Sequence, residues 1–107
     1  MKKYITLLLF AAILMGAGCK KDENSSELKA DFTFQISQNP GEVAFTNKSS
    51  NAQTYEWSFG DGRASTMKSP VHVYDFNDTY IVKLVAFGNQ KTSSFTDTIV
   101  ITNITKK

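Results

Sequence analysis

Trp57-Ser58-Phe59-Gly60-Asp61-Gly62 has the pattern of a β-strand that runs directly into a tight turn. Tyr55, Trp57 and Phe59 alternate with polar residues, so in an extended strand they share one face. The two glycines accept positive φ, and the aspartate between them can hydrogen-bond its own backbone two residues on, which ends the strand. We therefore expect Trp57 to lie in a core and the glycines to form a polar turn.

Short strands separated by turn signals extend from this segment in both directions. We expect further strands at residues 32–36, 43–45, 71–76, 79–87 and 92–104, with turns at 38–41 and 88–90. No ten-residue stretch after the first 18 residues shows helical periodicity. The sequence therefore predicts an all-β protein, folded as an antiparallel β-sandwich.

The motifs resemble those of the PKD domain, an immunoglobulin-like β-sandwich. They are the run from Tyr55 to Gly62, Ser65, Pro70-x-His72-x-Tyr74 and Tyr80-x-Val82-x-Leu84, preceded by Ala30-x-Phe32 and Val43-x-Phe45. The resemblance implies a domain over residues 29–105 with about seven strands. It also implies that eight residues of these motifs support the fold: Trp57, Phe59, Gly60, Asp61, Gly62, His72, Tyr74 and Tyr80.

The family usually has a glycine just before the strand that begins near Tyr80, and this chain has Asn77-Asp78 there. Asn and Asp adopt left-handed backbone geometry more readily than other non-glycine residues. We therefore expect the turn to be kept.

The number of cysteines and the balance of charges exclude a disulfide and argue against nucleic-acid binding. Cys19 is the only cysteine, so an intrachain disulfide is impossible. The chain has 12 Lys+Arg and 10 Asp+Glu, and Lys2 and Lys3 belong to a segment that we expect to be removed. The remaining charges balance at ten of each sign (12 minus 2 against 10), which gives no basic surface for nucleic acid.

The first 18 residues are predicted to be a lipoprotein signal peptide. Met1-Lys2-Lys3, an apolar run over 4–15 and Gly16-Ala17-Gly18-Cys19 have the three regions of a secretory signal. The last four residues resemble the bacterial lipobox, although that motif favours Leu where Gly16 stands. The resemblance implies lipidation of Cys19; the alternative is a secreted protein with a chance cysteine.

Residues 19–28 are predicted to be the lipidated cysteine and a flexible tether, because the stretch after Cys19 is polar and cannot pack. A lysine followed by acids after the cysteine, Lys20 to Glu23, also resembles a signal for surface export in a group of Gram-negative bacteria. This implies an outer-membrane protein at the cell surface. The alternative is a solvated linker that does not indicate the membrane leaflet.

Catalysis, cofactors and metals find little support in the sequence. His72 is the only histidine, it lies in a predicted strand, and no serine has the context of a nucleophile. Asp61 has two candidate roles, as a calcium ligand or as the residue that fixes its own turn, and we favour the turn. We predict no enzyme, no cofactor and no metal site.

Exposed aromatic rings could bind a glycan. Phe76, in a turn, and Phe87, on the outward face of its strand, are the candidates. The glycan-binding hypothesis predicts exposed coplanar rings near one end of the sandwich. The predicted function is non-catalytic binding of polysaccharide or of another envelope protein by a lipid-anchored module. The alternative is a structural spacer or an assembly subunit of an envelope complex that binds no glycan.

Overall fold

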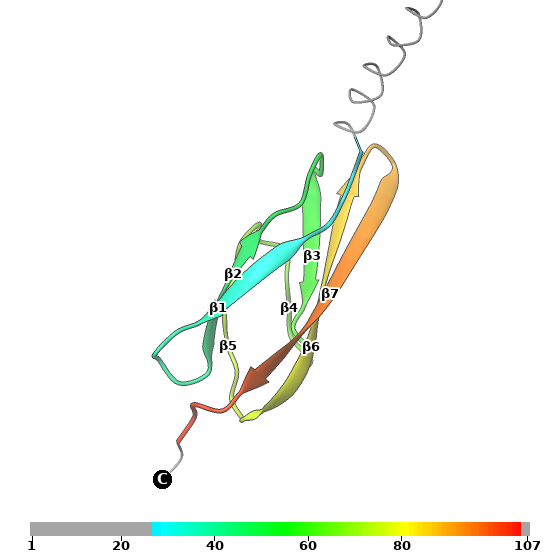
Figure 1. The fold of residues 1–107 in the computed structure, drawn as a ribbon. Helices are drawn as coiled ribbons and strands as arrows, with labels where there is room; N and C mark the ends of the chain where they lie inside the picture. The colour runs from blue at the N-terminus through cyan, green and yellow to red at the C-terminus, as the bar shows by residue number, and fades with distance from the viewer. Residues whose placement is uncertain (1–26, 106–107) are drawn as a thin grey trace, which may run out of the picture.

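The structure is a computed structural model that describes residues 27–105, and in these residues all regular elements are strands. The seven strands form two antiparallel sheets that pack face to face (Figure 1). They are β1 (Phe32–Ile36), β2 (Glu42–Asn47), β3 (Thr54–Ser58), β4 (Ala64–Ser65), β5 (Val71–Val73), β6 (Asp78–Gly88) and β7 (Lys91–Ile101). The predicted all-β sandwich is confirmed.

One sheet has the order β1-β2-β5 and the other the order β4-β3-β6-β7. β6 and β7 are each 11 residues long and pair along their whole length, from Asp78↔Ile101 to Gly88↔Lys91. The hairpin between them turns on Asn89 and Gln90, which have φ of 50° and 62°. Two consecutive residues with positive φ give a turn whose twist matches that of the flanking strands.

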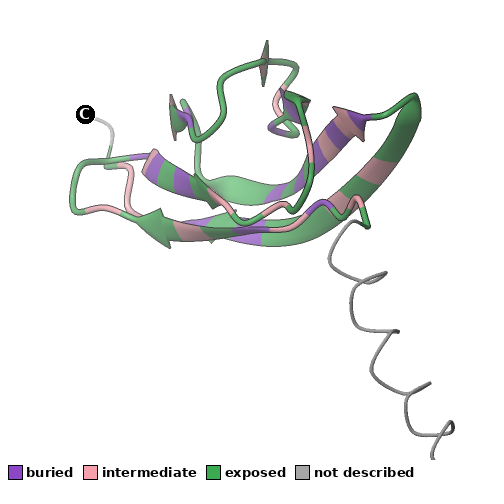
Figure 2. Ribbon diagram, turned by 90° about the horizontal axis from the view of Figure 1, so that it is seen from above, coloured by how far each residue is buried: buried purple, intermediate pink, exposed green. Residues whose placement is uncertain are grey.

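Aromatic and branched side chains from both sheets form the core. Figure 2 marks the buried residues along the ribbon. Trp57 is 1% exposed, and its ring centroid lies 5.0 Å from that of Phe32 and 5.2 Å from that of Phe45 on the opposite sheet. Its indole N–H donates to the carbonyl oxygen of Met67 at 2.9 Å. The predicted burial of Trp57 is confirmed, and the ring is the central contact between the sheets.

The strands differ most from expectation at three places, and the other bounds differ by no more than two residues. β4 was not predicted, because its two residues give no alternating pattern. β5 ends at Val73 rather than at residue 76, because the chain bends at Asp75 and Phe76 after Tyr74 N–H has donated to the carbonyl of Gly41. β7 ends at Ile101 rather than at residue 104.

The turn before β6 is kept, but by side chains rather than by left-handed backbone. Neither Asn77 nor Asp78 has a positive φ. The Asn77 amide instead donates to the Ile104 carbonyl at 2.9 Å and accepts from the Ile104 N–H at 3.0 Å. The explanation expected from the sequence was therefore wrong, because a long-range contact replaces the glycine.

The two ends of the domain lie at opposite ends of the sandwich (Figure 1). The chain enters beside the β6–β7 hairpin, where Lys29 and Ser50 form a small bridge, and it leaves beyond the far end of β7. In the part of the chain that the structure describes, no helix is long and apolar enough to cross a bilayer.

Candidate functional site

The turn after β3 is tied to β5 by Asp61 and His72. One carboxylate oxygen of Asp61 accepts the backbone N–H of Arg63 at 3.1 Å, and the other lies 2.7 Å from Nε2 of His72. The His72 ring stacks on Phe59 with centroids 4.0 Å apart and planes 8° apart. The Asp61 side chain thus holds its own turn and fixes the histidine on the opposite sheet.

The electrostatics of this pair stabilise the charged carboxylate. Burial by itself would raise the pKa of the Asp61 carboxyl. The hydrogen bonds from His72 and from the Arg63 backbone, together with the His72 charge, outweigh burial and hold the pKa below its ordinary value. The pair is therefore strongest when Asp61 is ionised.

Two tyrosines complete the cluster of motif residues. Tyr74 O–H donates to the Phe59 carbonyl at 2.8 Å, and Tyr80 O–H donates to the Phe76 carbonyl at 2.6 Å. Their rings stack with centroids 4.1 Å apart, and burial raises the pKa of the Tyr74 hydroxyl. These contacts connect the segments that follow β3 and β5 to β6, so this cluster supports the fold.

No third polar side chain hydrogen-bonds to His72 within residues 27–105. In the same residues, no three His, Cys, Asp or Glu side chains gather in a way that could hold a metal ion. A second candidate site lies on the outer surface of the sandwich.

The outer face of the four-stranded sheet carries a regular array of nine side chains. The register places Thr54, Phe87 and Thr92 in one cross-strand row, Glu56, Val85 and Ser94 in the next, and Ser58, Lys83 and Thr96 in the third. All nine are exposed or partly exposed. Each residue in the array is two positions from the next along its strand, which is why all of them point away from the core.

The central strand β6 gives this array an apolar line, formed by Phe87 and Val85. Hydroxyl groups flank it on both sides, from β3 and from β7. A sugar ring has an apolar face and an edge of hydroxyls. An apolar line on β6 with polar side chains of β3 and β7 on either side matches this chemistry. We call this nine-residue array the outer face array.

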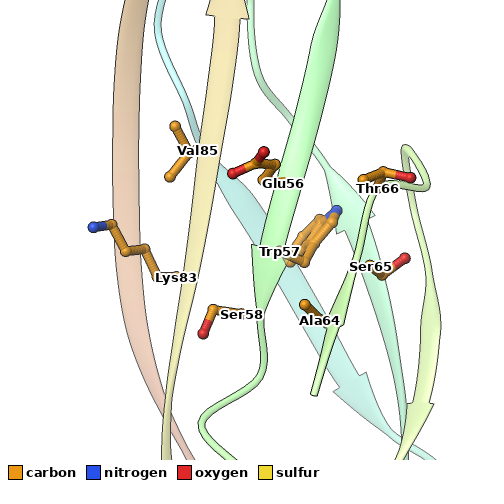
Figure 3. Close-up of a pocket in the computed structure, with 8 residues that line it drawn as sticks. All are labelled: Glu56, Trp57, Ser58, Ala64, Ser65, Thr66, Lys83 and Val85. Atoms are coloured by element: carbon orange, nitrogen blue, oxygen red, sulfur yellow. The ribbon is translucent and has the colours of Figure 1, made fainter. Parts of the chain in front are cut away.

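A shallow groove runs over β3 on this face (Figure 3). Its first hollow has a volume of about 760 Å³ and is lined mainly by residues of β3, β4 and β6: Glu56, Ser58, Ala64, Ser65, Lys83 and Val85, with Thr66. Its second hollow, of about 620 Å³, continues the groove along Gln53, Thr54, Tyr55, Lys68 and Phe87. Glu56 and Thr66 line both hollows, so the two lie next to each other.

The charged groups of the groove form no ion pair within residues 27–105. Glu56, Lys68 and Lys83 are exposed, and the ion pairs in this part of the chain are Arg63–Asp75 and Asp61–His72. Glu56 and Lys83 stand on neighbouring strands but in different rows, Glu56 opposite Val85 and Lys83 opposite Ser58. These side chains are thus available to a ligand.

The two aromatic candidates lie far apart. Phe87 is partly exposed and lines the groove, whereas Phe76 is 64% exposed in the turn before β6. β6, about 35 Å long, separates them. The expectation of coplanar rings near one end is wrong for this pair, because Phe76 and Phe87 flank opposite ends of one strand.

Other predicted positions are placed as follows. Cys19, the signal peptide and residues 20–26 of the tether lie outside the described residues. The motif residues Trp57, Phe59, Tyr74 and Tyr80 are buried, while Gly60 and Gly62 are exposed in the turn. Glu56, Lys83 and the hydroxyls of β7 were not singled out, because only the register between β3, β6 and β7 brings them beside Phe87.

Comparison with known proteins relates the chain to one family of domains. A family model described as the PKD domain matches residues 25–103. Collagenase ColQ1 of Bacillus cereus (strain Q1) is 43% identical over 47 residues, which are 44% of this chain and 5% of the collagenase. The chain therefore corresponds to a small part of that relative.

Solved structures give the same relationship. The PKD1 domain of the Vibrio cholerae metalloprotease PrtV superposes with a TM-score of 0.65 at 26% identity, over 69% of this chain and 95% of that domain. A structure described as one of the carbohydrate-binding modules from the β-sandwich superfamily superposes with a TM-score of 0.64 at 35% identity, over 73% of this chain and 35% of that one.

Proposed function

This chain belongs to the PKD domain family, and we propose that it is a non-catalytic binding module that holds polysaccharide on the outer face of its four-stranded sheet. The groove over β3 carries the proposal. It places the partly exposed ring of Phe87 near the charged side chains of Glu56, Lys68 and Lys83. Hydroxyl groups of β3 and β7 lie on either side of that ring. Protein sites for small polar ligands typically combine apolar contact with a few such polar groups.

The comparisons support a binding role for such a module. The solved structure described as a carbohydrate-binding module shares the sandwich at 35% identity. The PKD1 domain of PrtV is likewise one domain of a larger protein. Since fold alone does not set function, the groove and its exposed side chains carry the argument for sugar.

The proposed location is the outer membrane, with the domain anchored through lipid on Cys19 and displayed at the cell surface. The single cysteine directly after Ala17-Gly18 supports the anchor, and the charged residues that follow it support export. A polar tether of residues 20–28 would have a reach of about 15–18 Å, which keeps the domain near the membrane. The partners are then the membrane, through the anchor, and an envelope or external polysaccharide.

The absence of catalysis is part of the proposal. His72 is held by Asp61 and covered by the Phe59 ring, which suits a structural role. A module without turnover would hold glycan for neighbouring proteins.

Native gel electrophoresis with polysaccharide cast in the gel tests the binding function. The proposal predicts that the domain is retarded by at least one polysaccharide of a panel and that Phe87→Ala loses most of the retardation. Phe76→Ala is the matched control, because it removes an equally large ring at the other end of β6, and it should migrate as the unchanged protein does.

If no polysaccharide retards the domain, sugar binding is wrong and docking onto an envelope protein becomes the better account. If Phe76→Ala rather than Phe87→Ala loses retardation, the groove is not the site. Tryptophan fluorescence of buried Trp57 shows that each variant is folded.

A further inference from the structure

β7 has an open edge on the side away from β6. The hairpin turn at Asn89 and Gln90 is flanked by the pair Gly88↔Lys91, which in a two-residue turn exchanges both backbone hydrogen bonds. Because bonded and non-bonded pairs alternate along an antiparallel ladder, every second residue of β7 directs its N–H and C=O away from β6. These residues are Thr92, Ser94, Thr96, Thr98 and Val100.

The hydrogen bonds agree with this assignment. The Thr98 N–H donates to the Asp97 carboxylate at 2.8 Å, as expected for a group that faces away from β6. Within residues 27–105, β7 pairs only with β6, and the N–H groups of Ser94, Thr96 and Val100 donate to no other group. The backbone groups on this edge are therefore available to a further strand.

The other edges of the two sheets are short. β1, β4 and β5 have five, two and three residues, whereas β7 has 11. Natural edge strands are protected from further pairing by their shortness, by proline, by bulges or by charged side chains. From Thr92 to Ile101, β7 has no proline, an uninterrupted register and one charged residue, Asp97. β7 is therefore the edge that best accepts another strand.

We propose that the edge of β7 from Ser94 to Val100 binds an extended segment of another protein, which adds a fifth strand to the four-stranded sheet. The open stretch begins at Ser94, because the Ala30 N–H already contacts the Ser93 hydroxyl at 2.9 Å. The groove lies over β3 and β4, at the opposite edge of the sheet. The inference is thus independent of sugar binding.

The side chains of β7 define the chemistry of the partner. Phe95 and Asp97 lie opposite buried residues of β6, so both are on the core side of β7, and neither is fully buried. A guest residue opposite Phe95 gains from an apolar side chain, and one opposite Asp97 gains from lysine or arginine. The Asp97 carboxylate then releases the Thr98 N–H to the guest backbone. We therefore expect a guest strand with an apolar and a basic residue two positions apart.

A second copy of this chain fits the edge less well. Two β7 edges that pair antiparallel place the two N-terminal ends at opposite ends of a strand about 35 Å long. For the lipid-anchored chain proposed above, a tether with a reach of about 15–18 Å does not bring both copies to one membrane. This contrast assigns the edge to a different protein.

The test uses the mature chain with Cys19→Ser, which carries no lipid, and a blocked peptide of sequence Thr-Val-Thr-Lys-Thr-Val-Thr. Its lysine faces Asp97 when a valine faces Phe95. Amide hydrogen exchange is read by nuclear magnetic resonance. In the free chain, the N–H groups of Ser94 and Thr96 should exchange at least tenfold faster than those of Phe95 and Asp97, which bond to β6. Saturating peptide should slow Ser94 and Thr96 at least tenfold.

Methylation of the peptide nitrogens gives a matched control, because it removes backbone donors and leaves the side chains unchanged. Methyl groups on the two threonines beside the lysine block N–H groups that face β7 and should abolish the slowing. Methyl groups on the two valines block N–H groups that face away, and binding should persist. In the protein, Thr96→Pro removes one outward N–H and should weaken binding at least tenfold, whereas Thr96→Ala keeps this N–H and should bind normally.

The fluorescence of buried Trp57 shows that both variants are folded. Exchange of Ser94 and Thr96 that stays unchanged at millimolar peptide, or equal binding of the two methylated peptides, overturns the inference. Sedimentation of the chain alone as a dimer, with both N–H groups already protected, overturns the assignment to a different protein. Retardation by polysaccharide is measured separately, so failure of the sugar-binding proposal is distinguishable from failure of this one.

Discussion

Nε2 of His72 lies 2.7 Å from Oδ2 of Asp61, and both side chains are largely enclosed, with 11% and 14% of their surface exposed. The turn after β3 and the strand β5 are thereby joined across the two sheets. Since Phe59 stacks on His72 and accepts from Tyr74 through its carbonyl, this one pair is connected to the aromatic core. The pair should therefore contribute measurably to stability and to its pH dependence.

Replacing Asp61 by asparagine should change how stability depends on acid. The pKa of Asp61 is below its ordinary value in the folded protein, so its ionisation stabilises the fold above about pH 4, and this contribution is lost as pH falls through the folded pKa. Asp61→Asn should cost about 1–2 kcal/mol at pH 7 and much less at about pH 2. Urea unfolding at several pH values measures this.

Asp31→Asn serves as the comparison, because the Asp31 carboxylate forms no hydrogen bond or ion pair within residues 27–105. A gap between the Asp61→Asn variant and the unchanged protein that stays constant from pH 7 to pH 2 would refute the stabilising role of the ionised carboxylate.

The hydroxyl groups of Tyr74 and Tyr80 should contribute unequally to the free energy of unfolding. Tyr74→Phe leaves the Phe59 carbonyl without a donor inside the core and should cost about 1–2 kcal/mol. Tyr80→Phe should cost less, because its acceptor belongs to the exposed residue Phe76, where water can replace the hydroxyl. The free energy of unfolding in urea compares them, and a larger loss for Tyr80→Phe would contradict this reading.

The two glycines of the turn should respond unequally to alanine. Both have positive φ, 86° for Gly60 and 92° for Gly62, so each substitution carries backbone strain of about 1–2 kcal/mol. At Gly60 a Cβ would also lie 2.6 Å from the Ile81 carbonyl oxygen, whereas at Gly62 it meets no atom within 4 Å.

Gly60→Ala should therefore lower the thermal midpoint clearly more than Gly62→Ala does. Equal shifts would mean that the turn can move away from β6 without cost.

Much of the core could be predicted from the sequence, because alternation is a local signal. Tyr80, Val82, Leu84 and Ala86 alternate along the strand expected at residues 79–87, and all four are buried. The resemblance marked Asp61 and His72 as structural, but the contact between them joins positions 11 residues apart across two sheets. No local pattern reveals such a contact.

The candidate site could be predicted only in part. Phe87 was named from its place on a strand, yet its neighbours depend on which residue of β6 faces which residue of β3. The pairing Trp57↔Leu84 sets that register, and it brings Glu56 opposite Val85. Phe76 was equally plausible from sequence, and only the length of β6 shows that it lies elsewhere.

Lipidation of Cys19 remains a prediction from sequence with a direct test. In a Gram-negative bacterium, the unchanged protein should incorporate labelled palmitate and sediment with membranes, because acyl chains at about 0.8 kcal/mol per buried CH₂ anchor a protein without a spanning helix. Cys19→Ala should lose both properties. Label in the Cys19→Ala protein, or no label in the unchanged one, would contradict the anchor.

Protease treatment of intact cells then locates the domain. Loss of an epitope placed at Lys107 indicates display at the cell surface, and protection that ends on lysis indicates the periplasm.

The outer face array is tested most directly by nuclear magnetic resonance of the labelled domain, titrated with oligosaccharides cut from the polysaccharide that retards it in gels. The account predicts that shifted amide signals cluster in residues 54–58, 83–87 and 92–96, the segments that line the groove and the array. Shifts confined to the turn around Phe76, or to β1, β2 and β5, would show that the ligand binds elsewhere and would contradict the account.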